Sequence, residues 1–128
     1  DENDEYRKYL INLRKNGQYD ELSYVMHKIR REDLSMVDRS DAVIFNYDPD
    51  LMTCGSYEEY FWSLRLKRPA FIVIEKGLNR LPLWIYGCVP REYMFDSLKK
   101  LCYHLREIDT RKVGIDLNRW RLLDYKYR

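Results

Sequence analysis

The sequence predicts an α/β fold with a mainly parallel sheet, and the prediction rests on the stretch 41–75. Residues 42–45 (AVIF) and 71–74 (FIVI) are apolar runs that are too short for helices and rich in β-branched and aromatic side chains. Such runs are typical of strands that are covered on both faces. The segment between them has helical spacing and ends before Pro69. Two buried strands joined through a helix predict a right-handed βαβ unit with parallel strands.

Two helices are predicted before this unit. The first spans residues 3–15 and ends at Asn16–Gly17. The second spans about residues 20–37, with an apolar stripe of Leu22, Val25, Met26, Ile29, Met36 and Val37. Asp33 falls on this stripe. A carboxylate on an inward face is costly to bury unless it is paired or serves a site; pairing with Arg30 is the alternative.

For some of the segments after the second strand, the sequence allows two alternative structures. Residues 77–79 form a turn, and residues 81–86 form a short helix or an extended segment. Residues 94–105 have one apolar face and predict a helix. Residues 119–125 (RWRLLDY) form a final strand or an arm that packs on another subunit.

The predicted sheet is small for its fold class. Two strands make a poor core, and a doubly wound fold normally begins with a strand and a glycine-rich turn, whereas this chain begins with a helix. Either an N-terminal segment is missing or further strands lie in segments that look irregular. We expect the first, and treat residues 1–128 as a single, N-terminally incomplete domain.

Composition narrows the classes of function. The net charge is +2 with acids and bases interspersed, which favours neither a nucleic-acid polymer nor an anionic membrane as partner. No apolar run is long enough to span a bilayer, and the first residues, DENDEYRK, are unlike a signal peptide. Cys54, Cys88 and Cys102 lack C-x-x-C spacing, which indicates free thiols in a cytoplasmic protein. No metal-ligand spacing is present, so we expect no metal site.

Ligands of parallel α/β sheets bind beyond the carboxyl ends of the strands. The loop 48–55, Ser56 and Glu59 therefore lie at the expected site. Ser56 and Glu59 also have the S-x-x-E spacing of a capping box, so capping of the helix is the alternative role for Glu59.

The spacing of several residues across four predicted elements resembles the pattern of a known family. Asp33 on a helix is followed eight residues later by Asp41, which opens a strand. Gly55 lies in the following loop, Glu59 comes eighteen residues after Asp41, and Arg68–Pro69 begins nine residues after Glu59. This pattern, in residues 31–69, resembles the nucleoside 2-deoxyribosyltransferase family, including related nucleoside 5′-monophosphate N-glycosidases. The resemblance covers roughly the middle third of the chain.

The resemblance implies a flavodoxin-like or Rossmann-like doubly wound sheet that lacks the family's first strand here. It implies cleavage or transfer at the N-glycosidic bond of 2′-deoxynucleosides or their 5′-monophosphates, without a cofactor, in a homo-oligomer. Glu59 matches the family's nucleophile and Asp33 the aspartate that contacts the base. Gly55, Ser56, Asp41 and Asp50 are candidate substrate-binding residues. The alternatives are that Asp41 bonds to the neighbouring turn and that Asp50 is a solvated loop acid.

Two other functions stay open. Thr53 stands where some family members have a sugar-binding aspartate, and bulky Phe61 and Trp62 follow Glu59. The bulky Phe61 and Trp62, together with the absent N-terminal loop, favour a non-catalytic nucleotide-binding or interaction module with the same fold. A nicotinamide-dinucleotide glycohydrolase is the third and weaker alternative.

Overall fold

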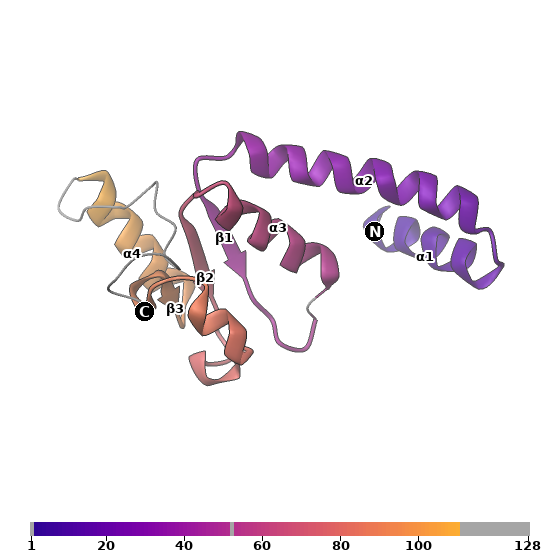
Figure 1. Cartoon of the computed structure of the whole chain (residues 1–128). Helices are drawn as coiled ribbons and strands as arrows, with labels where there is room; N and C mark the ends of the chain where they lie inside the picture. Colours follow the sequence, from indigo (N-terminus) through magenta and orange to yellow (C-terminus); the bar gives the residue numbers. More distant parts are fainter. Residues whose placement is uncertain (1, 52, 111–128) are drawn as a thin grey trace. The chain divides into compact units, whose positions relative to one another are not determined.

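A computed structural model describes residues 2–51 and 53–110 (Figure 1). In chain order the elements are α1 (Glu2–Lys15), α2 (Tyr19–Arg39), β1 (Val43–Asn46), α3 (Cys54–Arg65), β2 (Ala70–Val73), three short 3₁₀ turns η1 (Leu78–Arg80), η2 (Leu83–Gly87) and η3 (Arg91–Tyr93), β3 (Met94–Phe95) and α4 (Leu98–Asp109). The chain divides into two compact units, Asp1–Met36 and Val37–Arg128.

The second unit contains a parallel sheet with the strand order β1-β2-β3. Val43 of β1 lies opposite Ala70 of β2, and Ile72 of β2 lies opposite Met94 of β3. Helix α3 connects the first two strands, as predicted. The described residues thus combine helices with a small parallel sheet, which fits the α/β class.

The third strand corrects one prediction. Met94 and Phe95 were expected to begin a helix, but they form β3, and α4 begins only at Leu98. Ser97 is the N-cap of α4, and its hydroxyl oxygen accepts a hydrogen bond from the Lys100 N–H at 3.2 Å. The cap stops the helix from extending backwards, because an N-cap residue has extended backbone dihedrals.

Two further segments, residues 81–86 and 119–125, each had two alternative predictions. Residues 83–87 form the short helix η2 rather than an extended segment. The predicted strand or arm at residues 119–125 lies outside the residues that the structure describes.

Helices α3 and α4 cover opposite faces of the sheet. Tyr60 of α3 stacks on Phe45 of β1, with ring centroids 4.6 Å apart. His104 of α4 meets Phe71 of β2 edge-on at 5.9 Å. Phe45 lies opposite Ile72 in the register, and side chains alternate along a strand, so Phe45 and Phe71 point to opposite faces.

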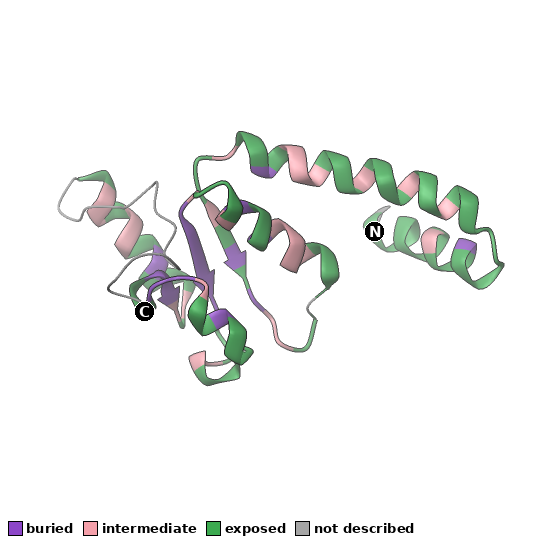
Figure 2. Ribbon diagram, viewed as in Figure 1, coloured by how far each residue is buried: buried purple, intermediate pink, exposed green. Residues whose placement is uncertain are grey.

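The core lies between these layers (Figure 2). Every residue of β2 is buried, which explains its continuous apolar sequence. In β1, Phe45 is buried but Ile44 is 49% exposed, so this strand is covered mainly on its α3 face, and the prediction that both its faces are covered is wrong. The core cluster consists of Phe45, Tyr47, Tyr60, Ala70, Phe71, Ile72, Val73, Ile74, Leu81, Ile85, Val89, Tyr93, Met94 and Leu101.

The first unit is a helical hairpin. Gly17, at a φ of 72°, ends α1 in the left-handed conformation that glycine adopts easily, as predicted from Asn16–Gly17. The Tyr9 hydroxyl donates to Glu21 Oε1 of α2 at 2.6 Å. Among the described apolar residues of this unit only Leu13 is buried, at 4% exposure.

Candidate functional site

The loop that follows β1 is held to the end of β2 by four charged side chains. Lys76 Nζ lies 2.9 Å from Asp48 Oδ1 and 2.6 Å from Asp50 Oδ2. Arg80 Nη2 lies 3.2 Å from Asp50 Oδ1. These contacts, first of all the hydrogen bonds from Lys76, lower the pKa of Asp48 and Asp50. Asp50 is therefore an ion-paired residue in this structure, and neither carboxylate is a simple solvated loop acid.

Helix α3 begins earlier than predicted. Its N-cap is Thr53, whose Oγ1 accepts a hydrogen bond from the Ser56 N–H at 3.4 Å. The two hydroxyls also lie 3.2 Å apart. The predicted capping box of Ser56 and Glu59 is therefore wrong, because Ser56 is the third residue of the helix and Glu59 the sixth. Both Thr53 and Ser56 are preferred cap types, so the sequence alone left two starting points.

Gly55 leaves space at the start of α3. A Cβ built on it would meet Thr53 Oγ1 at 4.0 Å as its nearest neighbour. No close packing or left-handed backbone therefore demands glycine here. Together with partly buried Ser56, it forms a small surface next to the first N–H groups of the helix, a position that suits anionic or hydroxyl-bearing ligands.

Glu59 is partly buried, one turn further along α3. Trp62, three residues later, shares its flank of the helix and donates a hydrogen bond from Nε1 to Asp38 Oδ1 at 2.7 Å. Arg68 donates to the carbonyl oxygens of Ser40 and Asp38, the latter at 3.1 Å. These bonds attach the last turn of α2 and the following residue to the α3 segment.

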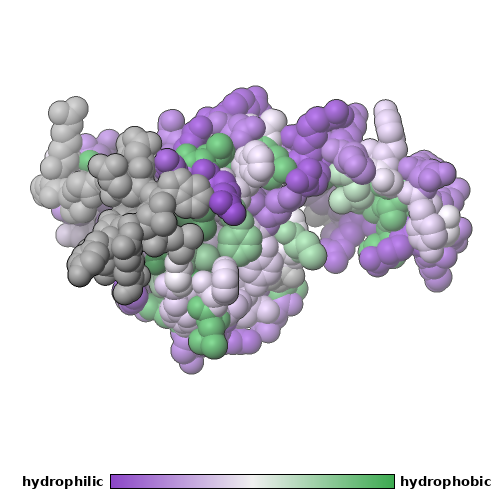
Figure 3. Space-filling model, in the orientation of Figure 1, coloured by the Kyte–Doolittle hydropathy of each residue, from purple (hydrophilic) through white to green (hydrophobic). Residues whose placement is uncertain are grey.

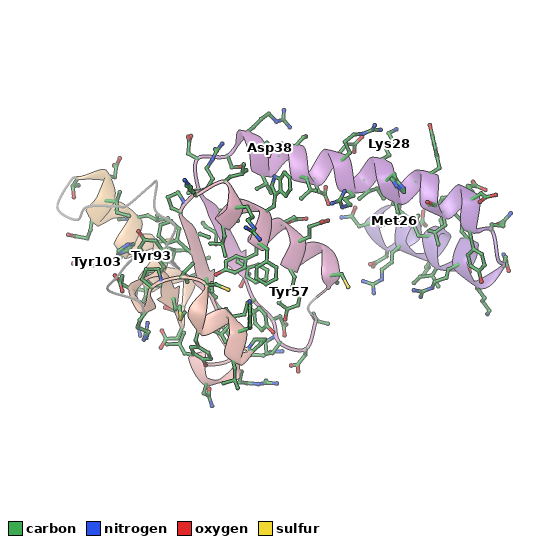
Figure 4. All side chains as sticks on the ribbon, viewed as in Figure 1. Met26, Lys28, Asp38, Tyr57, Tyr93 and Tyr103 are labelled. Atoms are coloured by element: carbon green, nitrogen blue, oxygen red, sulfur yellow. The ribbon has the colours of Figure 1, made fainter. Side chains whose placement is uncertain are left out.

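Aromatic side chains occupy the opposite flank of α3, and the sequence did not predict this cluster. Tyr57 and Phe61 stack at 6.1 Å, and the Tyr57 and Tyr47 hydroxyls share a hydrogen bond of 2.7 Å. Desolvation by burial and this bond raise the pKa of Tyr47 to about 12. Tyr57 is labelled on α3 in Figure 4. Its spacing of four from Phe61 was the signal available beforehand.

The remaining candidates lie elsewhere. Asp41 is exposed in the bend before β1. Asp50 follows that strand, so the two aspartates flank opposite ends of β1. Asp33 is partly buried on α2, in line with the partly buried Leu22, Val25 and Ile29. It belongs to the first unit, whereas Glu59, Gly55 and Ser56 belong to the second.

Asp50, Gly55, Ser56 and Glu59 thus all belong to the second unit, in the segment that runs from the end of β1 into α3. The carboxylate of Glu59 can act as a base or a nucleophile, and the helix start can bind polar groups of a ligand. Within residues 2–51 and 53–110, no group of three or more histidine, cysteine or acidic side chains has the geometry to hold a metal ion. None of the helices in those ranges is long and apolar enough to cross a bilayer.

Three comparisons with known proteins were made for the whole chain. No family model matches it, and neither the curated proteins nor the solved structures contain a match.

Proposed function

We propose that this protein breaks the N-glycosidic bond of 2′-deoxynucleosides or deoxynucleoside 5′-monophosphates, with Glu59 as the nucleophile. The observation that carries the proposal is the cap of α3. Thr53 caps the helix, so Glu59 does not serve the role that was its main structural alternative. A partly buried carboxylate on the helix that follows a parallel strand is then a candidate for chemistry.

The reaction follows the logic of a retaining glycosidase. A carboxylate oxygen of Glu59 attacks C1′ of the sugar, and the bond from C1′ to the base nitrogen breaks with its electron pair going to the base. Asp33 is proposed to contact the base and supply the proton that it takes up. Water or a second base then attacks C1′, which frees Glu59 and gives hydrolysis or transfer. No cofactor is needed for these steps.

The packing of the bulky neighbours supports a catalytic protein over a non-catalytic module. Phe61 points away from Glu59, because two residues along a helix correspond to a rotation of about 200°, and it stacks on Tyr57. Trp62 shares the flank of Glu59, but its indole is hydrogen-bonded to Asp38. Both large side chains therefore have partners of their own.

The finer features of the proposal rest on the resemblance. These are a Rossmann-like, flavodoxin-like sheet, substrate contacts from Gly55, Ser56, Asp41 and Asp50, and assembly into a homo-oligomer. A cytoplasmic location is proposed from the three free cysteines, of which Cys54 and Cys102 are exposed.

Chromatography of free base released from a panel of deoxynucleosides and their 5′-monophosphates tests the proposal. Glu59→Gln should reduce base release on the order of a thousandfold, because the amide cannot replace the carboxylate nucleophile. Base exchange in the presence of a second base would identify transfer.

The matched control is Glu58→Gln, which removes the adjacent, similarly buried carboxylate and should keep most of the activity. Both variants should show the circular dichroism of the parent. If the folded parent released no base from any compound of the panel, the proposal would be wrong, and a non-catalytic binding module would take its place. Equal losses in the two variants would exclude Glu59 as the nucleophile.

A further inference from the structure

The helical hairpin of α1 and α2 has too little core of its own. It belongs to a unit of 36 residues, Asp1–Met36, in which Leu13 is the one buried apolar side chain among residues 3–36. Units below about 40 residues usually need disulfides, a metal or association with another chain. This unit contains no cysteine. Association with a further protein surface would cover it.

The uncovered side chains form a face along the seam between the two helices. Leu10, Leu22 and Ile29 are only partly buried, and Met26 is 42% exposed. Met26 lies four residues after Leu22 and three before Ile29, so the three share one side of α2. Figure 3 shows apolar side chains gathered between the two helices on the viewed face, and Figure 4 labels Met26 there.

The charges of α1 suit a second copy of the same chain. Asp4 and Glu5 lie in the first turns of α1, and Arg14 and Lys15 lie in its last turn. In a two-fold symmetric pair, the same patch meets itself, and two antiparallel copies of α1 place the acidic start of each beside the basic end of the other. The unit as a whole has eight acidic and seven basic residues, so two copies do not repel strongly.

We propose that two α1–α2 hairpins pair through this face into an antiparallel four-helix bundle, with a second copy of this chain as the partner. The face is about 25 Å long and about 20 Å wide, from 1.5 Å per residue and helix diameters of about 10 Å. Its area of roughly 500 Å² is smaller than the area of about 800 Å² that each partner buries in a standard interface. The dimer is therefore expected to dissociate on dilution. This proposal does not depend on the enzymatic one.

Sedimentation equilibrium of the full chain over a range of concentrations tests the pairing. The parent should approach twice the monomer mass of 15.8 kDa. Met26→Lys should raise the dissociation constant about tenfold or more, because it places an unpaired charge in the apolar face. Tyr24→Lys is the matched control: Tyr24 is 76% exposed on the other side of α2, and the variant should dimerise like the parent.

A charge exchange gives a second test that does not alter the apolar face. Asp4→Lys with Glu5→Lys should weaken the dimer, and so should Arg14→Glu with Lys15→Glu. The four changes together should restore it, because each altered end again faces an opposite charge on the partner. A restored dimer cannot be explained by a more stable α1, because basic residues at the start of a helix and acidic residues at its end are unfavourable to the helix dipole.

A monomeric parent at high concentration overturns the proposal, because the hairpin is then covered within its own chain. A dimer that survives both Met26→Lys and the two charge reversals also overturns it, by showing that another surface forms the interface. Dissociation by Tyr24→Lys as strongly as by Met26→Lys would do the same.

Discussion

The hydroxyl of Tyr60 is the one fully buried side-chain oxygen or nitrogen without a hydrogen-bond partner in the described part of the chain. Its ring stacks on Phe45 and contributes to the core, while burial of the hydroxyl raises the pKa of Tyr60. A buried polar group without a partner costs free energy of folding, and removing it keeps the aromatic packing.

Tyr60→Phe should therefore leave the free energy of unfolding unchanged or raise it by about 1 kcal/mol. Tyr57→Phe is the contrasting variant, since it removes the hydrogen bond to Tyr47 and should lower that free energy by about 1 kcal/mol. Urea denaturation of the three proteins measures both effects. A clear loss of stability in Tyr60→Phe would mean that its hydroxyl has a partner in solution.

Substitution of Gly55 is expected to change the stability and the activity of the protein in opposite directions. A methyl group on it has room, and alanine is the better helix former, so Gly55→Ala should raise the free energy of unfolding by about 0.5–1 kcal/mol. If substrate approaches the backbone here, base release should fall in the same variant. Parallel assays of denaturation and base release check this. Full activity with raised stability would place the substrate away from Gly55.

At the scale of elements, Lys76 joins the loop after β1 to the end of β2. Its hydrogen bonds hold the pKa of Asp48 and Asp50 below the ordinary value of an aspartate. A carboxyl group with a lower pKa in the folded state stabilises the fold above its unfolded pKa. That stabilisation is lost as the pH falls through the folded pKa. The gain is small because all the side chains are exposed.

The melting temperature of the parent should consequently fall as the pH drops below about 4, and Lys76→Met should make that fall shallower. Added salt should reduce the difference between the two proteins, since it screens exposed pairs. Lys99→Met, a change of an exposed lysine on α4, serves as the control and should follow the parent. Identical pH profiles for the parent and Lys76→Met would show that the pairs do not form in solution.

The helix boundaries show which local signals decide structure. Asn16–Gly17 ended α1 as predicted, because only the end of a helix accommodates that turn easily. The start of α3 was ambiguous, since Thr53 and Ser56 both have hydroxyls suited to an N-cap. The start of α4 was misplaced for another reason. Met94 and Phe95 fit the apolar face of a helix, but pairing with β2 takes them into the sheet.

At the scale of the molecule, the candidate site depends on what each side chain of α3 meets. The sequence placed Glu59 near the strand ends, and the chain does run from β1 into α3 there. It did not reveal that Trp62 hydrogen-bonds to Asp38, or that Tyr57 hydrogen-bonds to Tyr47. These contacts join residues that are 10 to 24 positions apart, and local spacing holds no information about such pairs.

The sequence by itself determined the two N-terminal helices, the strands β1 and β2 and the helix between them. Each depends on periodicity and end signals within one segment, which act locally. Only the tertiary structure decided the third strand, the cap of α3 and the pairing of Asp50 with Lys76 and Arg80. The third strand and the ion pairs join residues that are distant in the chain, whereas the cap of α3 is a local choice between two hydroxyls that the sequence left open.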